Sequence, residues 1–305
     1  MPTVQKPRTV RTSAIALGVV SLLFAGACSN ATDGVSDTNS EGSASGSVIG
    51  DSLDDELVTP GVLTVAIFDT SPPGSFYAED GRLIGWEVEL AANLADQLAL
   101  DIDFIGGSFD SVLGAVESGA ADIGIASIFD TRERQQRVDF VEYFVGGTSW
   151  AVASDSDFNP LDPCGSRVGA LEGSTQLIDY LPRLSGQCVG SGAEAIEAVS
   201  YEAMTTAASD TTAGALDAMV TDDPVVAYLA SQSFGRLRVP QTYIEAQPYG
   251  IALPKGKDRL GRAIQSALDA SREDQFYRNL LGRWGLQAGA VADFTSSGIA
   301  DPDQE

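Results

Sequence analysis

Residues 109–140 constrain the fold of this chain more than any other segment, because they place a helix and a buried strand in direct succession. Apolar side chains recur at helical spacing in its first part, at Val112, Leu113 and Val116. Asp110 and Ser111, which precede these apolar residues, favour a helix N-terminus. Gly119, which follows them, favours a helix end. The apolar run 121–126 then predicts a short strand buried in a parallel sheet.

Polar residues follow this strand directly, at the edge where an open α/β sheet binds its ligands. Ser127 is the first of them, Thr131 is placed to cap a second helix, and Arg134 follows that cap. A guanidinium group matches a carboxylate with two parallel hydrogen bonds, and a hydroxyl and free helix amides add further donors. These residues predict a receptor for a carboxylate. The alternative, an exposed arginine on a charged turn, stays open at this point.

Strands and helices alternate through the rest of the chain. In the first part, strands are expected at residues 62–67, 101–105 and 121–126, with a helix reaching Leu98 and another from Phe109. This order predicts a doubly wound α/β lobe. The second part contains an extended segment at 146–153, a strand at 167–171, a helix opening at 172–176, a strand ending at Asp222, a return crossing at 247–253 and a final helix at 264–284.

The same segments resemble the extracellular amino-acid-binding proteins that serve ABC importers, the family 3 solute-binding proteins. The resemblance is carried in order by SGAADIGIA, DTRER and VDFVEYF, by PPGSF with GRLIGWEVELA, and by EGSTQ, GALDAMVTDDPVVAYL, PYGIALPKG and GRWG. It covers residues 57–286 and implies a periplasmic-binding-protein-like fold of type II, with two doubly wound lobes joined by a two-crossing hinge. Lobe 1 is expected to comprise residues 57–147 and 248–288, and lobe 2 residues 148–247. The implied function is capture of an amino acid between closing lobes and delivery to ABC permease subunits.

The resemblance also assigns roles to individual residues. It implies that Arg134 and Ser127 bind the ligand carboxylate, with Ser174 and Thr175 adding a hydroxyl and backbone amides, and that Asp222 binds the ammonium. For Ser174, Thr175 and Asp222 the alternative is a helix cap, and Asp223 competes with Asp222. Side-chain specificity is expected to depend on an aromatic platform and its neighbours, namely Phe109, Phe68, Asp69, Ser71, Phe76, Trp86 and Phe129.

Several of these positions remain ambiguous. Phe109 could be an ordinary core residue, and Asp69 could form an Asx turn before Ser71 rather than face a cationic ligand. Gly74 and Ser71 stand where the family often has aromatic residues, and Phe129 stands where it often has a small hydroxyl residue.

The N-terminus predicts export and anchoring. Residues 1–27 combine three basic residues with an apolar run too short to span a bilayer, and Ala25-Gly26-Ala27 before Cys28 resembles a bacterial lipobox. We expect a signal peptide over 1–27, lipidation of Cys28 and an extracytoplasmic protein anchored to the bacterial cell membrane. An ordinary signal peptide with a chance cysteine is the alternative. Residues 28–56 predict a flexible tether and residues 289–305 a disordered acidic tail.

Charge and cysteine content narrow the possible partners. The formal net charge is −25, and it becomes −28 once residues 1–27, with three basic and no acidic side chains, are removed. An acidic surface argues against nucleic acid and against anionic lipid headgroups, which leaves the lipid anchor as the expected membrane contact. Outside the cytoplasm, Cys164 and Cys188 most simply form a disulfide, and without any histidine they would make a poor zinc site. We expect a monomer without a cofactor or metal.

Two rival functions remain. A periplasmic enzyme resembling cyclohexadienyl or arogenate dehydratases would need an acid in the cleft, such as Glu172 or Glu202. The chain has no histidine, no cysteine left over after a disulfide and no glycine-rich phosphate loop, so a binding protein rather than an enzyme is expected. The other rival is an extracytoplasmic ligand sensor of the same design.

Overall fold

The computed structural model describes residues 53–299, apart from the side chains of residues 241–243. The expected signal peptide, the expected lipidation site Cys28 and most of the expected tether lie outside these residues, as do residues 300–305. Within 53–299, no helix is long and apolar enough to cross a membrane.

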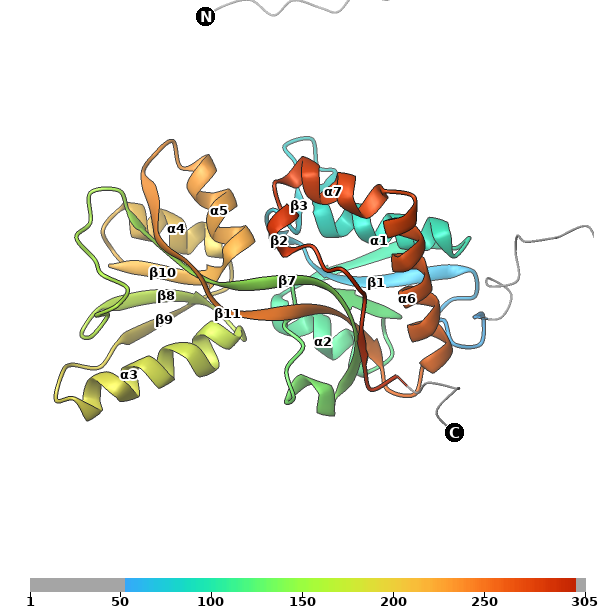
Figure 1. The fold of residues 1–305 in the computed structure, drawn as a ribbon, viewed down its shortest axis with the longest axis horizontal. Coiled ribbons are helices and arrows are strands. Elements are labelled where there is room, and N and C mark those ends of the chain that lie inside the picture. Colours follow the sequence, from blue (N-terminus) through green and yellow to red (C-terminus); the bar gives the residue numbers. More distant parts are fainter. Residues whose placement is uncertain (1–52, 300–305) are drawn as a thin grey trace, which may run out of the picture. The chain divides into compact units, whose positions relative to one another are not determined.

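The first lobe is built on three parallel strands in the order β5-β1-β6 (Figure 1). These strands are β1 (Val62–Phe68), β5 (Asp101–Gly107) and β6 (Ile123–Ile125). Side chains of β1 alternate between two faces: Leu63, Val65 and Ile67 join one core cluster, whereas Ala66 and Phe68 join another. Helices cover both faces, which is why this lobe is doubly wound. They are α1 (Trp86–Gln97), α2 (Phe109–Glu117), α6 (Asp258–Glu273) and α7 (Phe276–Trp284).

A small antiparallel sheet lies between β1 and α1 in the sequence. It consists of β2 (Thr70–Ser71), β3 (Ser75–Tyr77) and β4 (Leu83–Ile84). Ser75 is fully buried, and its hydroxyl donates to the carbonyl of Phe68 at 2.7 Å. This bond joins the small sheet to the carboxyl end of β1.

The second lobe repeats the strand and helix alternation. Its strands follow the order β10-β8-β9 and pair in parallel: β8 (Arg167–Leu171), β9 (Glu197–Tyr201) and β10 (Ala218–Asp222). Its helices are a short π-helix (Gln176–Tyr180), α3 (Leu181–Gly190), α4 (Met204–Thr212) and α5 (Asp223–Gln232). The expected strands at residues 167–171 and ending at Asp222 are therefore present.

Two long strands connect the lobes (Figure 1). β7 (Val138–Ala153) and β11 (Leu237–Pro254) pair antiparallel, from Leu237 opposite Ala153 to Pro254 opposite Val138. β11 meets β6 of the first lobe, and β7 meets β10 of the second. The two crossings expected near 146–153 and 247–253 thus belong to one continuous ladder, which four register shifts interrupt.

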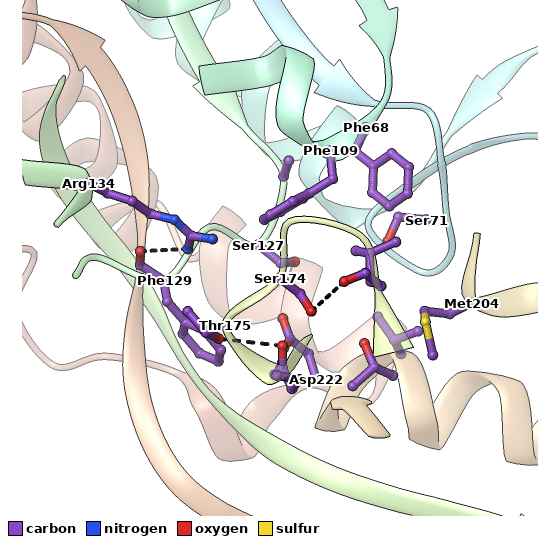
Figure 2. A pocket seen from close by; sticks show the side chains of 15 residues that line it. Phe68, Ser71, Phe109, Ser127, Phe129, Arg134, Ser174, Thr175, Met204 and Asp222 are labelled. Atoms are coloured by element: carbon purple, nitrogen blue, oxygen red, sulfur yellow. Dashed lines mark hydrogen bonds between the residues drawn. The ribbon is translucent and has the colours of Figure 1, made fainter. Parts of the chain in front are cut away.

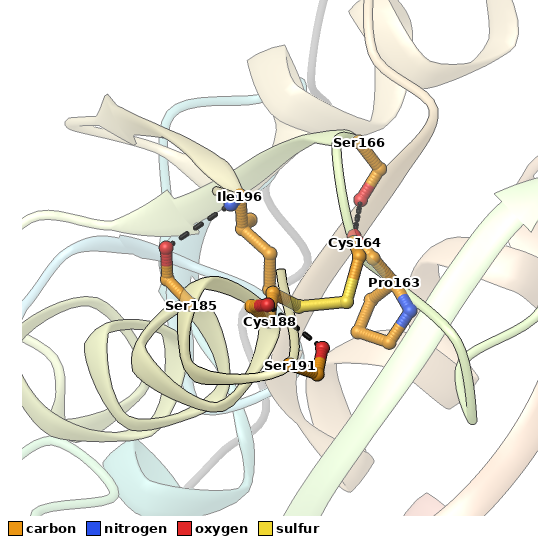
Figure 3. The surroundings of a disulfide bond; sticks show 7 residues. All are labelled: Pro163, Cys164, Ser166, Ser185, Cys188, Ser191 and Ile196. Carbon is orange, nitrogen blue, oxygen red and sulfur yellow. Dashed lines mark hydrogen bonds between the residues drawn. A yellow bond between two sulfur atoms is a disulfide. The ribbon is translucent and has the colours of Figure 1, made fainter. Parts of the chain in front are cut away.

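Cys164 and Cys188 form a disulfide within the second lobe, as expected (Figure 3). Their Cα atoms are 5.5 Å apart, and they are 24 positions apart in the sequence. Cys188 lies in α3, and its carbonyl accepts the hydroxyl of Ser191 at 2.8 Å. The bridge joins α3 to the loop that precedes β8.

The expected single helix over 264–284 is wrong, because two helices occupy this region. α6 ends before Asp274, and α7 begins at Phe276. Gln275 between them has a left-handed backbone with φ of 70°, and the Asp274 carboxylate accepts the amide of Phe276 at 2.8 Å. A left-handed residue ends one helix, and the aspartate satisfies a free amide at the start of the next.

The termini of the globular part also differ from the expectation. Residues 289–299 are not a disordered tail: Phe294 is buried against Tyr277, and β12 (Ser296–Ser297) pairs with β7. The tether ends before residue 56, since Leu53 is buried and Glu56 pairs with Arg259. In both places large apolar side chains join the core, Leu53 at the start and Phe294 with Val291 and Ile299 at the end, which outweighs the polar composition around them.

The two helix starts within residues 109–140 differ in detail from those predicted from the sequence. α2 begins at Phe109 behind Ser108, and Asp110 makes no side-chain cap, while the Ser111 hydroxyl donates to the Ser108 carbonyl at 2.7 Å. The expected second helix is a single 3₁₀ turn, Arg134–Gln136, and Thr131 Oγ1 accepts the amide of Arg134 at 3.3 Å.

Candidate functional site

A cavity lies between the two lobes (Figure 2). Four of its wall residues lie at or just after the carboxyl ends of strands: Phe68 at the end of β1, Ser127 after β6, Leu171 at the end of β8 and Asp222 at the end of β10. Parallel strands place their carboxyl ends at one edge of a sheet, so the two lobes present these edges to one another. The complete lining is Phe68, Ser71, Phe109, Ala126, Ser127, Phe129, Arg134, Leu171, Ser174, Thr175, Gln176, Met204, Thr221, Asp222 and Val225.

Arg134 is buried in the wall of this cavity rather than exposed on a turn. Its side chain donates from Nη1 to the Phe129 carbonyl at 3.0 Å and from Nη2 to the Gly173 carbonyl at 3.4 Å. The guanidinium carbon lies 5.4 Å from the centre of the Phe109 ring. Burial lowers the pKa of Arg134, and the carboxylate of Asp222 opposes this. The two carbonyls use two of its five N–H groups, which leaves donors for a carboxylate.

Asp222 is the acid that faces the cavity. Its carboxylate accepts Gln176 Nε2 at 2.7 Å and the Tyr249 hydroxyl at 2.9 Å. Burial raises the pKa of Asp222 to about 7, and the two hydrogen bonds and Arg134 work in the opposite direction. An ammonium group arriving here would find a carboxyl group whose ionisation is balanced near neutrality.

Asp223, the neighbouring acid, binds a backbone amide instead of facing the cavity. It is the first residue of α5 and accepts the amide of Gly147 at 2.7 Å, where β7 crosses between the lobes. Asp223 is outside the cavity lining, so of the two adjacent acids only Asp222 is available to a ligand.

Ser127 lines the cavity, but both of its donors point to a residue behind the wall. Its amide donates to Glu87 Oε1 at 2.6 Å, and its hydroxyl donates to the same oxygen at 3.0 Å. Its backbone is left-handed, with φ of 50°. The expected donation from Ser127 to a carboxylate is therefore not available in this conformation.

At the start of the π-helix in the second lobe, the adjacent hydroxyls of Ser174 and Thr175 have different surroundings. The buried Ser174 hydroxyl donates to the Leu171 carbonyl at 2.7 Å and accepts the amide of Leu177 at 3.3 Å, which is what a cap does. Thr175 lines the cavity one residue before the π-helix, and its hydroxyl lies 3.4 Å from Gln176 Oε1. Thr175 is thus the freer of the two hydroxyls.

The aromatic residues separate into two groups. Phe109 and Phe129 line the cavity: Phe109 packs edge-on against Phe68 at 6.0 Å, and Phe129 packs against Tyr249 at 5.1 Å. Phe76 lies outside the lining, where its ring packs against Trp284 of α7 and Tyr228 of α5.

Three other expected specificity positions also have defined surroundings. Trp86 is fully buried in the core, packed against Phe144. Asp69 lies outside the lining, next to Gly106, where an added Cβ would be 2.2 Å from Asp69 Oδ2. Ser71 lines the cavity as expected.

Residues that were given no role on sequence grounds complete the site. Gln176 joins Asp222 to Thr148, donating to the Thr148 hydroxyl at 3.0 Å, and Met204 and Val225 add apolar surface. Gln176 belongs to the run EGSTQ, so its position was visible in the sequence, whereas its hydrogen bond to Asp222 depends on the packing of two strands.

The acids considered for an enzyme lie elsewhere. Glu172 and Glu202 line a separate pocket together with Asp110. Neither is in the wall of the cavity that contains Arg134 and Asp222. Within residues 53–299, no group of three or more His, Cys, Asp or Glu side chains could hold a metal ion.

Known proteins resemble this chain over most of its described residues. The family model of bacterial extracellular solute-binding proteins, family 3, matches residues 63–287. The arginine-binding protein ArgT of Corynebacterium glutamicum is 32% identical over 238 residues, which cover 77% of this chain and 78% of that protein.

Solved structures are similar over the same region. An ancestral arginine-binding protein bound to arginine matches with a TM-score of 0.66 and 29% identity, over 73% of this chain and 98% of that one. The ancestral amino acid-binding protein AncCDT-1, a precursor of cyclohexadienyl dehydratase, matches with a TM-score of 0.65 and 25% identity, over 77% and 98%. The chain therefore belongs to the bacterial extracellular solute-binding proteins of family 3.

Proposed function

We propose that this protein captures an amino acid between its two lobes and delivers it to an ABC importer. The observation that carries the proposal is a pair of opposite charges, Arg134 and Asp222, that come from different lobes and line one cavity. An amino acid carries the complementary pair of charges. A buried charge without a partner costs several kcal/mol, so a zwitterion suits this cavity better than a ligand with one charge.

In this proposal each end of the zwitterion has its own receptor. Arg134 binds the carboxylate with the donors that the two backbone carbonyls leave free, and Thr175 adds its hydroxyl. Asp222 accepts the ammonium, while Gln176 holds the Asp222 carboxylate in place. The ring of Phe109 covers the ligand from the side of the first lobe.

Closure of the lobes would make both receptors act at once. We place the lobe boundaries at residues 57–147 with 248–288, and at 148–247, so that the hinge falls where Gly146 pairs with Gln247. The bond from Arg134 to the Gly173 carbonyl and the ring contact of Phe76 with Tyr228 then join the lobes in the closed form. A ligand that contacts both lobes selects this form.

Arginine is the first amino acid to test, because an arginine-binding protein and an arginine-bound structure are among the similar proteins. The end of the cavity away from Arg134 is lined by Phe68, Ser71 and Met204 (Figure 2). An aromatic ring at that end could stack on a guanidinium group. Asp69, one residue beyond Phe68, is the nearest acid in the sequence.

We further propose that the protein is a lipoprotein attached through Cys28, that it acts as a monomer, and that it is not an enzyme. The support is the sequence of residues 1–28 for the anchor, and for the last point the position of Glu172 and Glu202 outside the main cavity. A ligand sensor of the same design would use the same cavity.

A thermal-shift screen of the mature protein against the common amino acids tests the proposal. At a hundred times its dissociation constant, a ligand should add about 2.7 kcal/mol to the free energy of unfolding. The proposal fails if no amino acid raises the melting temperature. Turnover of prephenate or arogenate by the pure protein would instead favour the dehydratase.

A further inference from the structure

Glu87 is a buried acid directly behind the cavity wall, and the proposed function gives it no role. It is the second residue of α1 and is 1% exposed. Its Oε1 atom accepts the amide of Ser127 at 2.6 Å, the hydroxyl of Ser127 at 3.0 Å and the hydroxyl of Tyr143. Burial raises the pKa of Glu87, while these three donors favour the carboxylate. Three donors on one oxygen make a tightly defined position for Ser127.

The geometry of Ser127 depends on this contact. A left-handed backbone is unfavourable for a residue other than glycine, and Ser127 has φ of 50°. The bonds from its amide and its hydroxyl to Glu87 compensate for this conformation. A serine hydroxyl has one proton, so a hydroxyl that donates to Glu87 can only accept a hydrogen bond from the cavity.

Glu87 also contacts the other loop that the first lobe presents to the cavity. An added Cβ at Gly74 would lie 2.5 Å from Glu87 Oε2 and 3.2 Å from the Ser71 carbonyl. The amide of Glu87 donates to the Gly74 carbonyl at 3.1 Å. One side chain therefore touches both the loop that carries Ser71 and the corner that carries Ser127, which explains why position 74 has no aromatic side chain.

We infer that Glu87 is a positioning residue of the ligand site, which holds Ser127 so that its hydroxyl oxygen faces the cavity as a hydrogen-bond acceptor. This inference rests on the proposed amino-acid ligand, whose ammonium group can donate a hydrogen bond to the Ser127 hydroxyl oxygen. Ser127 then assists Asp222 at the ammonium rather than Arg134 at the carboxylate. Glu87 itself does not line the cavity and acts only through Ser127.

A double-mutant cycle tests the inference, with L-arginine as the calorimetric probe, replaced by the amino acid with the largest wild-type thermal shift if arginine gives none. We expect Ser127→Ala and Glu87→Ala each to weaken binding roughly ten- to hundredfold, as for loss of a hydrogen bond to a charged group. Because both remove the same interaction, the double variant should be within about threefold of Glu87→Ala. Glu87→Gln keeps an acceptor oxygen and should restore binding to within about threefold of the wild type.

Glu89→Ala is the matched control. Glu89 is an acid in the same turn of α1, but it accepts Trp284 Nε1 at 2.9 Å and pairs with Arg283, away from Ser127. The Glu89→Ala variant should bind with the wild-type affinity even if its melting temperature falls.

Two results would overturn the inference. One is Ser127→Ala with wild-type affinity, a variant that leaves Glu87 in place and so does not depend on the folding of Glu87→Ala. The other is an additive double variant, which would mean that Glu87 affects binding independently of Ser127. If no amino acid binds the wild type, the proposed function fails first, and the inference with it.

Discussion

The two lobes prepare their sides of the cavity in different ways. The first lobe contributes Arg134, a permanent cation held by backbone carbonyls, and Ser127, whose donors are already engaged by Glu87. The second lobe contributes Asp222, an acid whose pKa burial raises to about 7 and whose partners are the neutral donors Gln176 and Tyr249. The cationic end of the site therefore has a constant charge, whereas the anionic end can titrate.

From this difference we can predict which substitutions should change the affinity for the ligand and which should change only the stability of the protein. Removing either charge should harm binding most, because both are needed for a zwitterion. Damage confined to one lobe's scaffold should affect stability and leave binding intact. Protonation of Asp222 should act through the second lobe.

The largest effect is expected from the two charges. Arg134→Ala or Asp222→Ala leaves one ligand charge buried without a partner, which should cost about 2–5 kcal/mol of binding free energy, or roughly 30- to 5000-fold in affinity. Isothermal calorimetry measures this loss, and small-angle scattering shows whether ligand-induced closure is also lost.

Arg137→Ala is the control for Arg134. Arg137 forms an exposed pair with Glu117 in the same short stretch, so its loss should cost less than about 0.5 kcal/mol. Near-wild-type affinity in both Arg134→Ala and Asp222→Ala would show that the ligand binds elsewhere.

The disulfide tests the separation of scaffold from site. Cys164→Ser opens the loop of the Cys164–Cys188 bridge, which lies in the second lobe away from the cavity. On the chain-entropy model its loss should lower the free energy of unfolding by about 3 kcal/mol. Denaturation measures the loss of stability, and calorimetry at a temperature where the variant is folded should give the affinity of the wild type. A parallel loss of affinity would mean that the second lobe transmits strain to Asp222.

Gly173 tests the contact between the lobes. Its φ is 70°, and an added Cβ would lie 1.6 Å from Asp110 Oδ1 on α2 of the first lobe. Gly173→Ala should therefore oppose closure and weaken binding by about 1–3 kcal/mol, the usual cost of overpacking. Calorimetry measures the affinity, and scattering measures the closed fraction.

Two further variants sharpen this test. Asp110→Ala in the Gly173→Ala background removes the clashing carboxylate and should restore part of the affinity. Gly186→Ala in α3 has open space around the added Cβ and should change nothing in binding. If Gly173→Ala binds as the wild type does, these segments are apart in the closed form.

The smallest effect is the pH dependence. Because the pKa of Asp222 is raised to about 7, the group holds a proton below that pH, and binding an ammonium must release it. Affinity should therefore fall as the pH drops below 7, by about 20-fold between pH 7.5 and 5.5, and should be nearly constant above pH 8. Asp222→Asn should bind weakly with a flat profile over this range, and a profile that persists in this variant would assign the titration to another group.

Local sequence patterns were enough to predict most of the secondary structure and part of the site. Helical spacing, strand-like apolar runs and glycine stops placed most elements. Polar residues after a strand pointed to Ser127 and Arg134, and the family resemblance added Asp222; all three line one cavity. Two cysteines in a chain expected to be exported were enough to predict the disulfide. These features depend on neighbours in the sequence or on composition, so they can be predicted before any contact is known.

Tertiary structure decided what each side chain does there. Asp222 and Asp223 are adjacent in sequence, and only the amide of Gly147, 76 residues away, explains why Asp223 is engaged at the hinge. Ser127 donates from its amide and its hydroxyl to Glu87, 40 residues earlier, so both of its donors are already engaged. The break at Gln275 and the docking of Phe294 likewise depend on the packed core. A hydrogen bond or a buried contact between distant segments leaves no local pattern, because its geometry exists only once both segments are packed.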